Sequence, residues 1–428
     1  MKIAVLGTGY VGLVAGACFA DLGNTVICGD IDSKKIELLN AGHCPIYEPG
    51  LEEIIERNVQ AKRLSFTTDV GKAVQNSEII FIAVGTPQDQ DGTPDLKYVK
   101  SVAETIGKNM TNEKIIINKS TVPVGTGDLV SEIISKYYKG KFHVVSNPEF
   151  LREGNAIKDF MEPDRVVIGA DSESIKKTLG DLYAPLNAEI LFTDVKTAEM
   201  IKYASNAFLA VKISFINEVA NLCDAVNADV RLVAEGMGLD ARIGKAFLKA
   251  GCGWGGSCFP KDVIGLISIG NQAHVNLSVA QAAYHSNDLQ KKLPVEKLKK
   301  VLGNLKGKQV GLLGLAFKPD TDDMRDAPSL VIMDLLKKEG AEIKAFDPVA
   351  MENSKKLFSE TEYVSSVYDV FKNMDAVILV TEWNEFKELD FVKAKSLMKN
   401  SVLIDARNLY NPQKMRNLGF TYVGLGSK

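Results

Sequence analysis

Short apolar runs alternate with longer stretches of helical spacing through the first 150 residues. The runs are too brief for helices and end in turns rich in small polar residues, which is typical of buried strands. Alternation of strand and helix predicts a doubly wound parallel sheet. The expected strands are residues 2–6, 25–29, 78–84, 114–118 and 143–146, and the expected helices are residues 13–22, 96–108 and 128–138.

The same pattern returns near the C-terminus, with expected strands at 310–315, 343–346, 376–381 and 402–406 and a helix at 328–338. Between the two regions, residues 197–227 lack Gly and Pro and carry apolar residues at helical spacing, which predicts one long helix. Shorter helices are expected around 229–235 and 241–249. The predicted fold class is α/β, with two Rossmann-like doubly wound domains joined by a long central helix. The predicted domains are residues 1–196, 197–295 and 296–428.

Composition narrows the function classes. The formal net charge is -3 and charged residues are evenly spread, so no basic stripe exists to attract nucleic acid or an anionic membrane. No run of 18 apolar residues is present to span a bilayer. The six cysteines lack CxxC spacing and nearby histidines, so we expect no metal site and a reducing, cytoplasmic compartment.

A glycine turn joins the first expected strand to the first expected helix. In the sequence Gly7-Thr8-Gly9-Tyr10-Val11-Gly12, the first glycine permits a tight turn, the second admits a pyrophosphate and the third allows close packing. Asp30 ends the second strand, where an acid binds the ribose of NAD and disfavours NADP. An unrelated surface aspartate is the alternative. Lys35 is close enough to reach the same ribose, and a solvated helix lysine explains it equally well.

The turns after the next three strands carry small polar residues. Because ligands of such sheets bind beyond the carboxyl ends of the strands, residues 85–87, 119–123 and 147–149 are expected to line one cleft. Glu149 and Glu153 are four residues apart, which places both carboxylates on one face if this turn is helical. Paired carboxylates suit acid/base chemistry, although the residues alone favour a solvated helix start.

Four glycines between positions 251 and 256 precede Cys258 and Pro260. Pro260 favours a helix start, so Cys258 is expected just before a helix N-terminus, with Lys261 nearby and Asp262 as a possible base. Such a setting suits a nucleophilic thiolate better than a buried structural cysteine. Lys202 and Asn206 lie one turn apart on the long helix and can address one bound group. This helix is apolar on most sides, which predicts a homodimer.

These residues together resemble the UDP-glucose/GDP-mannose dehydrogenase family, and within it the branch that acts on UDP-glucose. The resemblance covers nearly the whole chain and rests on the glycine turn with Asp30, on the pairs and loops above, and on four further motifs. Those motifs are Tyr47-Glu48-Pro49-Gly50, Lys119 to Pro123, Asn147 to Gly154 and Ala316-Phe317-Lys318.

The resemblance implies a four-electron oxidation of UDP-glucose to UDP-glucuronate with two NAD per turnover, through an aldehyde, a thiohemiacetal and a thioester on Cys258 that water hydrolyses. It implies that Lys202 and Asn206 stabilise the oxyanion and that Asp262, with Glu149 through water, handles protons. Thr121 positions that water, and Glu153 contacts the cofactor or the substrate loop.

The resemblance also implies two sets of ligand contacts. The cofactor residues it implies are Gly7, Gly9, Tyr10, Val11, Gly12, Asp30, Lys35, Thr86, Thr121, Glu153, Lys261 and Arg325. The substrate residues are Glu149, Phe150, Leu151, Arg152, Glu153, Lys202, Asn206, Phe247, Leu248, Lys249, Ala250, Gly251, Gly255, Phe317 and Lys318, with Arg242 reaching the sugar from a neighbouring subunit.

Three other functions compete with this one. The same chemistry on GDP-mannose or a UDP-N-acetylhexosamine is the nearest, although the N-acetylmannosamine branch resembles a motif with histidine where this chain has Ser257. A single-step hydroxyacid dehydrogenase has no use for Cys258 or for a second α/β domain. A catalytically silent nucleotide-sugar sensor would lack the nucleophile or the base, and both are present.

Overall fold

The computed structural model describes residues 1–89 and 92–428. These residues form two compact units, each made of two segments of the chain. The first unit comprises Met1–Ser205 with Ile264–Val275, and the second comprises Asn206–Val263 with Asn276–Lys428. Each unit is built around its own sheet, and each is described in turn.

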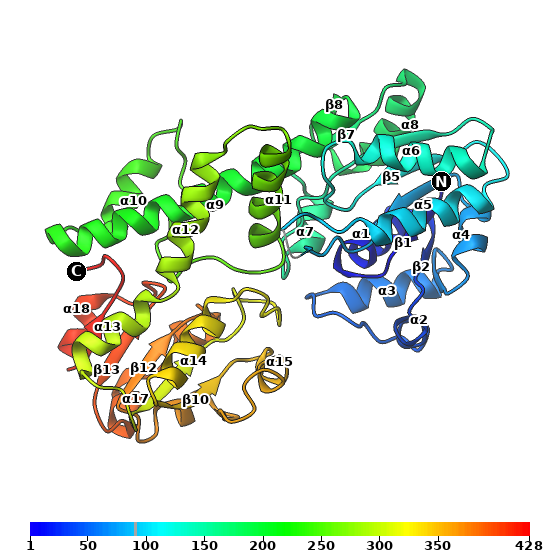
Figure 1. Cartoon of the computed structure of the whole chain (residues 1–428). Coiled ribbons are helices and arrows are strands. Elements are labelled where there is room, and N and C mark those ends of the chain that lie inside the picture. The colour runs from blue at the N-terminus through cyan, green and yellow to red at the C-terminus, as the bar shows by residue number, and fades with distance from the viewer. Residues whose placement is uncertain (90–91) are drawn as a thin grey trace. The chain divides into compact units, whose positions relative to one another are not determined.

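An eight-stranded sheet forms the centre of the first unit, in the order β3-β2-β1-β4-β5-β6-β7-β8 (Figure 1). Strands β1 to β6 are parallel in the order 3-2-1-4-5-6, which is the Rossmann order that the sequence predicts. The strands are β1 (Lys2–Leu6), β2 (Thr25–Gly29), β3 (Leu64–Thr67), β4 (Ile79–Ile82), β5 (Ile115–Asn118), β6 (His143–Ser146), β7 (Val166–Gly169) and β8 (Ile190–Thr193).

Alternate residues of these strands face two separate cores. Ile3 and Val5 of β1 belong to one buried cluster, and Ala4 and Leu6 belong to the other. The first cluster is completed by helices α1 (Tyr10–Asp21), α2 (Ser33–Asn40), α3 (Leu51–Gln60), α7 (Ala156–Met161) and α8 (Glu173–Tyr183), and the second by α4 (Val70–Asn76), α5 (Lys97–Asn109) and α6 (Thr126–Tyr137). Helices therefore cover both faces of the sheet, as a doubly wound fold requires.

The sheet departs from the expected parallel arrangement at β7. Strands β6 and β7 run antiparallel and meet at Ser146 and Gly169, while β7 and β8 are parallel. A parallel neighbour needs a crossover, usually a full helix, and the connection after β6 contains only the six-residue α7. The 3-10 helix η1 (Ala184–Leu186) leads into β8. The sequence pattern predicted neither β7 nor β8.

The long central helix is present as α9 (Val195–Val226), 32 residues in length. It is followed by α10 (Val230–Gly238), α11 (Phe259–Gln272), α12 (Ser278–Gln290) and α13 (Leu293–Leu302). The helix expected at 241–249 is wrong, because this segment consists of turns. Gly244 and Phe247 have φ angles of 70° and 64°, and these left-handed conformations do not continue a helix.

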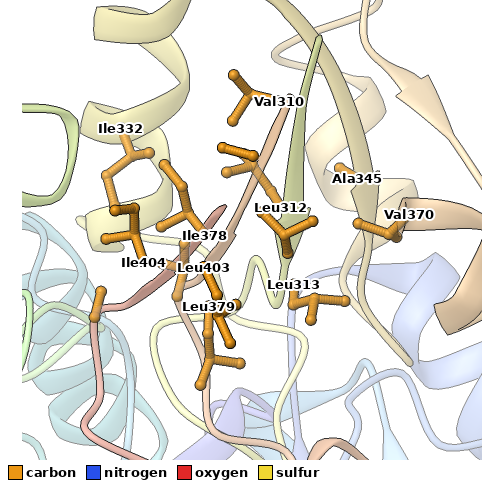
Figure 2. Packing of buried hydrophobic residues seen from close by; sticks show 14 of the residues in the cluster. Val310, Leu312, Leu313, Ile332, Ala345, Val370, Ile378, Leu379, Leu403 and Ile404 are labelled. Carbon is orange, nitrogen blue, oxygen red and sulfur yellow. The ribbon is translucent and has the colours of Figure 1, made fainter. Parts of the chain in front are cut away.

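A six-stranded parallel sheet forms the core of the second unit, in the order β11-β10-β9-β12-β13-β14. Figure 2 shows side chains of β9, β12 and β13 packed together with Ile332 from α14. The strands are β9 (Gln309–Leu313), β10 (Glu342–Phe346), β11 (Glu362–Tyr363), β12 (Ala376–Leu379), β13 (Val402–Asp405) and β14 (Thr421–Val423). The order 3-2-1-4-5-6 is thus repeated. The predicted fold class, two such domains joined by a long helix, is confirmed.

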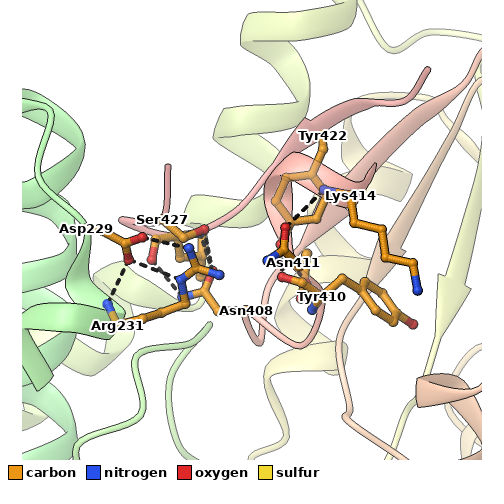
Figure 3. Close-up of polar contacts among 10 residues, drawn as sticks. Asp229, Arg231, Asn408, Tyr410, Asn411, Lys414, Tyr422 and Ser427 are labelled. Atoms are coloured by element: carbon orange, nitrogen blue, oxygen red, sulfur yellow. Dashed lines mark hydrogen bonds and ion pairs between the residues drawn. The ribbon is translucent and has the colours of Figure 1, made fainter. Parts of the chain in front are cut away.

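Short helices connect the strands of the second sheet. They are α14 (Pro328–Lys338), α15 (Met351–Lys355), η2 (Val367–Phe371), α16 (Asn384–Lys387), α17 (Phe391–Leu397) and α18 (Pro412–Asn417). The last residues of the chain return to the start of α10. The Val230 N–H donates to the Gly426 carbonyl at 2.8 Å, and Ser427 donates to Asn408 at 3.0 Å, beside the Asp229–Arg231 pair (Figure 3).

Within the described residues, no helix is both long enough and apolar enough to cross a membrane.

Candidate active site

The glycine turn after β1 has the shape that a dinucleotide requires. Gly7 has a φ of 105°, and a Cβ atom there would lie 2.6 Å from the Ala83 carbonyl oxygen. A Cβ at Gly12 would lie 2.0 Å from the Gly7 oxygen, so neither position tolerates a side chain. A Cβ at Gly9 would meet no atom within 4 Å. Gly9 thus borders open space at the N-terminus of α1, where a pyrophosphate group fits.

Asp30 is held in place beside this turn. The backbone N–H and the hydroxyl of Thr8 donate to Asp30 Oδ2 at 2.7 and 2.8 Å, and Asp32 N–H donates to Oδ1 at 3.0 Å. Burial alone would raise the pKa of Asp30, but these hydrogen bonds outweigh it and the pKa is lowered. The half-buried carboxylate is therefore ionised, and its contact with a ribose remains a prediction. Lys35 is half-buried on α2, and its contact with the ribose remains a prediction.

The turns after β4, β5 and β6 are joined to one another. Thr86 donates its hydroxyl to the Thr121 carbonyl at 2.9 Å, and Ser120 donates to the Val84 carbonyl at 2.6 Å. The Asn147 N–H donates to the Asn118 carbonyl at 2.9 Å. These contacts bring the three turns together at one edge of the sheet, and the expectation that they line one cleft stays a prediction.

A buried ion pair occupies this edge. Lys202 Nζ lies 3.0 Å from Glu149 Oε1, and both side chains are at most 5% exposed. Glu149 Oε2 accepts a second hydrogen bond from the Leu151 N–H at 2.6 Å. The ring of Phe150 lies 5.2 Å from the Lys202 ammonium. Lys202 and Glu149 were predicted separately, and the fold brings them into direct contact.

The loop from Asn147 to Gly154 is not helical, so the expectation that Glu149 and Glu153 share a helical face is wrong. Helix α7 begins only at Ala156. Glu149 is turned inward to Lys202, and Arg152 is exposed and pairs with Asp159 at 2.6 Å. The backbone therefore does not hold the two glutamates on one helical face.

The sequence analysis missed the buried group behind Glu149. Lys119 Nζ donates to Asn147 Oδ1 at 2.9 Å and to the Tyr183 hydroxyl at 3.4 Å, while Asn147 donates to the Val167 carbonyl at 2.8 Å. Burial lowers the pKa of Lys119 to about 8, and the neighbouring charge of Glu149 acts in the opposite direction. Lys119 thus anchors the turn that presents Glu149. The lysine belonged to a recognised motif, but nothing in the motif indicated its partner.

In the second unit, Cys258 directly precedes α11, as predicted from Pro260. The Cys258 carbonyl accepts the Asp262 N–H at 2.8 Å, and Ser257 Oγ lies 3.6 Å from Cys258 Sγ. A helix N-terminus stabilises a negative charge such as a thiolate. The residue types and the local backbone therefore suit a nucleophilic cysteine.

Asp262 is fully buried and has two partners in this unit. Asn206 Nδ2 donates to Asp262 Oδ2 at 2.6 Å, and Lys261 Nζ lies 2.5 Å from Asp262 Oδ1. The structure thus brings together two predicted catalytic residues, Asn206 of α9 and Asp262 of α11. It also fixes the orientation of the Asn206 amide, because its nitrogen must face the carboxylate.

Polar side chains from α9 and α12 hold the backbone ahead of Cys258. Asn287 accepts the Trp254 N–H at 2.8 Å and donates to the Trp254 carbonyl at 3.0 Å, so it pairs with the backbone as a strand would. Asn217 accepts the Gly251 N–H and Gln290 donates to the Gly251 carbonyl, both at 2.8 Å. The loop is therefore fixed without regular secondary structure.

A half-buried arginine completes this support. Arg407 donates to the Gly253 carbonyl at 3.1 Å, the Val380 carbonyl at 2.8 Å and the Phe317 carbonyl at 3.3 Å. A Cβ at Gly255 would lie 2.2 Å from the Asp326 oxygen, so the loop packs directly against backbone. Sequence reasoning missed Arg407 because its partners are remote in the chain.

The remaining predicted ligand residues of the second unit have defined surroundings, and their roles remain predictions. Leu248 and Ala250 are buried, and Lys318 lies 5.5 Å from the Phe317 ring. Arg325 pairs with Asp323 at 2.7 Å, and Arg242 pairs with Asp240 at 2.6 Å with 89% of its side chain exposed. Across the described residues, no cluster of three His, Cys, Asp or Glu side chains could hold a metal ion.

The second sheet has an acid at the position of Asp30, but its environment differs. Asp347 follows β10 and is completely buried. Its Oδ2 accepts from the backbone of Leu315 and Ala316 and from the indole of Trp383, at 2.7 to 3.1 Å. Its Oδ1 accepts from Val349 and Ala350 at 3.0 and 2.8 Å. This carboxylate has no capacity left for a ribose, so the second sheet does not repeat the dinucleotide site.

A Rossmann sheet with an open glycine turn and an ionised acid directly after β2 is typical of a dinucleotide-dependent oxidoreductase, and the cysteine at the start of α11 is the candidate nucleophile. The chain belongs to the UDP-glucose/GDP-mannose dehydrogenase family. Residues 1–187 match the NAD binding domain of that family, residues 196–289 its central domain and residues 311–412 its UDP binding domain.

Known relatives are similar over their full length. The UDP-glucose 6-dehydrogenase TuaD of Bacillus subtilis is 50% identical over 428 residues, which cover 99% of this chain and 93% of that protein. The solved UDP-glucose dehydrogenase of Pyrobaculum islandicum has a TM-score of 0.94 and 40% identity, with 100% and 98% coverage. The UDP-D-ManNAc dehydrogenase of Pyrococcus horikoshii has a TM-score of 0.88 and 28% identity, with 100% and 99% coverage.

Proposed function

We propose that this protein oxidises UDP-glucose to UDP-glucuronate and reduces two NAD in each turnover. The observation that carries the proposal is Cys258 at the N-terminus of α11, one turn ahead of a buried carboxylate, Asp262, that is bonded to Asn206. The full-length similarity to UDP-glucose 6-dehydrogenases supports the choice of substrate.

The cofactor fits the first unit. The open space at Gly9 accommodates a pyrophosphate, and ionised Asp30 accepts hydrogen bonds from the adenosine ribose. Bound NAD supplies the acceptor for a hydride. The residues of the Thr86 and Thr121 turns complete the proposed pocket. The selection of NAD over NADP follows from the carboxylate, which repels a 2′-phosphate.

The first oxidation converts the C6 alcohol of glucose to an aldehyde. The hydroxyl proton leaves to water, with Glu149 and Asp262 as the proposed bases, while the hydride leaves from C6. Lys202 and Asn206 lie one turn apart on α9, and both donate to the oxygen on C6 as its negative charge develops. Both side chains are buried, which strengthens these interactions.

The aldehyde carbon bears a hydrogen but no hydroxyl group. It therefore cannot lose the second hydride until a nucleophile adds to it. The Cys258 thiolate therefore adds to C6 and forms a thiohemiacetal, which loses the second hydride and becomes a thioester. Water attacks the thioester, the C–S bond breaks, and the products are the carboxylate and free Cys258. Asp262 and Glu149 accept the protons released from that water.

The ratio of NADH formed to UDP-glucose consumed tests this mechanism. We expect a ratio of about two for the wild type. Cys258→Ser retains hydride removal from the alcohol but is expected to stall after one oxidation or at a trapped intermediate. Cys44→Ser is the matched control, since Cys44 is a half-buried thiol far from the α11 loop in sequence. A wild-type ratio near one would overturn the thioester mechanism.

The identity of the sugar needs its own test. GDP-mannose and UDP-N-acetylhexosamines are alternative substrates for the same chemistry. The proposal predicts that UDP-glucose has the highest kcat/KM among them, measured in parallel by NADH absorbance. Preference for an N-acetylhexosamine would contradict the choice of substrate and leave the role of Cys258 intact.

We also propose that the enzyme works as a homodimer. Phe208, Phe215, Leu222 and Val226 are each at least half exposed and fall on one side of α9, an apolar stripe that favours burial against another chain. The exposed Arg242 supports a role in a neighbouring subunit. Phe215→Glu should yield a monomer by sedimentation velocity. The six cysteines are free thiols, which supports a reducing cytoplasmic compartment.

A further inference from the structure

Glu48 belongs to the Tyr47-Glu48-Pro49-Gly50 motif, which the mechanism above does not use. The Glu48 residue is only 6% exposed, and its carboxylate accepts from the Tyr10 hydroxyl and from backbone N–H groups of residues 154–156. Glu48 Oε1 accepts the Ala156 N–H at 2.7 Å, and Oε2 accepts the Gly154 N–H at 2.6 Å. The Tyr10 hydroxyl also donates to Oε2. A buried carboxylate with this many donors is firmly placed.

The contacts join two regions that the proposed function assigns to different ligands. Tyr10 is the first residue of α1 and belongs to the glycine turn, where NAD is proposed to bind. Gly154 ends the loop that carries Glu149 and Glu153, which is the proposed substrate loop. The Gly154 N–H also donates to the Tyr10 hydroxyl at 2.8 Å, so Tyr10, Glu48 and Gly154 form one hydrogen-bonded group.

The group also explains how the start of α7 is stabilised. The residue before α7, Asn155, makes no side-chain hydrogen bond to the helix. Glu48 supplies the missing acceptor for the first N–H group of α7, at Ala156. The end of the substrate loop therefore depends on a residue 108 positions earlier in the chain.

We propose that Glu48 is a positioning residue that couples NAD binding at the glycine turn to the placement of residues 149–154, so that the cofactor increases the affinity for the sugar nucleotide. The proposal rests on the proposed function. Bound NAD restrains the backbone at the start of α1, where Tyr10 lies. The Tyr10 hydroxyl then restrains Glu48 and Gly154, which lowers the cost of ordering the substrate loop when the second ligand binds.

The test measures the affinity for UDP-glucose by isothermal titration calorimetry, with and without saturating NADH. UDP-glucose and NADH can bind together without turnover, because NADH cannot accept a hydride. For the wild type we expect NADH to tighten UDP-glucose binding by about 5-fold or more. Tyr10→Phe removes the hydroxyl and leaves the Glu48 bonds to Gly154 and Ala156, so the loop stays folded. In this variant the ratio of the two dissociation constants should fall to within about twofold of one.

Tyr47→Phe is the matched control, since it removes a hydroxyl from the neighbouring, exposed residue of the same motif. It should keep the wild-type ratio. Glu48→Gln replaces one acceptor oxygen by an amide N–H₂ facing donors, and it should lower both the ratio and the melting temperature.

Three results would overturn the proposal. They are a wild-type ratio near one, an unchanged ratio in Tyr10→Phe, and a Glu48→Gln variant that melts earlier but keeps the wild-type ratio. The last result would reduce Glu48 to a purely structural role. The proposed function is judged from the turnover of the wild type, and the coupling from binding, so the two failures are distinguishable.

Discussion

Replacing Lys202 by methionine tests the buried ion pair at the edge of the first sheet. Lys202 and Glu149 are 3.0 Å apart and both are at most 5% exposed, so Lys202→Met leaves a carboxylate buried without its ammonium. Removing one member of a buried pair costs about 3–5 kcal/mol. Because Glu149 keeps the hydrogen bond from Leu151, we expect the lower end, about 3 kcal/mol. For a unit of this size that lowers the melting temperature by about 6–12 °C.

The double variant Glu149→Gln/Lys202→Met separates this electrostatic cost from the loss of packing. It removes both charges, and we expect it to regain most of the lost stability while remaining inactive. Stability is measured by urea unfolding followed by circular dichroism and by calorimetry, and activity by NADH absorbance. Loss of an oxyanion donor should lower kcat by about 10²–10³ in the single variant. A double variant no more stable than Lys202→Met would refute the reasoning.

Two further predictions follow from local geometry and charge. Gly9→Ala should fold with an unchanged melting temperature but raise the KM for NAD by about tenfold or more, because its methyl group fills the proposed pyrophosphate space. Gly12→Ala should lower the free energy of unfolding by about 1–3 kcal/mol, because its methyl group meets the Gly7 oxygen. Equal stability of the two variants in urea unfolding would contradict this. Burial raises the pKa of Glu199 to about 7, although hydrogen bonds from Gly125 and Gly127 act in the opposite direction. The folded state therefore binds this proton more tightly than the unfolded state does. Stability should fall as the pH rises from about 4.5 to about 7. Glu199→Gln should flatten this fall in melting temperature, and a wild-type profile that rises over the same range would contradict the sign.

The parts of the fold that the sequence predicted depend on local patterns. Apolar runs followed by glycine or small polar turns located β1, β4, β5 and β6, and the Gly-free stretch located α9 almost to the residue. The position of Cys258, the proposed nucleophile, was predicted in the same way, because four glycines and Pro260 favour a loop followed by a helix start. These features are properties of adjacent residues, which is why one sequence suffices to detect them.

The errors and omissions have a common physical cause. The segment 241–249 has helical composition, but the backbone at Phe247 is left-handed, a conformation imposed by packing rather than by residue type. Arg407 supports a carbonyl 154 positions away, and Glu48 one N–H 108 positions away. A charged residue on a helix or turn resembles a solvated one until its partner is known. The supporting side chains of the site therefore could not be predicted from the sequence. The proposed reacting groups could be, because local motifs contain them.

The two acids that follow β2 and β10 have a consequence for engineering the chain. Asp30 and Asp347 occupy equivalent places in two sheets that share a strand order. Asp30 keeps acceptor capacity, whereas both carboxylate oxygens of Asp347 already accept hydrogen bonds from nearby backbone N–H groups and from the Trp383 indole. The position in the second sheet that is equivalent to Asp30 is thus part of the core. Restoring a GxGxxG turn there would not create a second dinucleotide site, because the acid needed for recognition now holds the loops after β9 and β10 together. A shared strand order therefore does not imply a shared ligand chemistry in this chain.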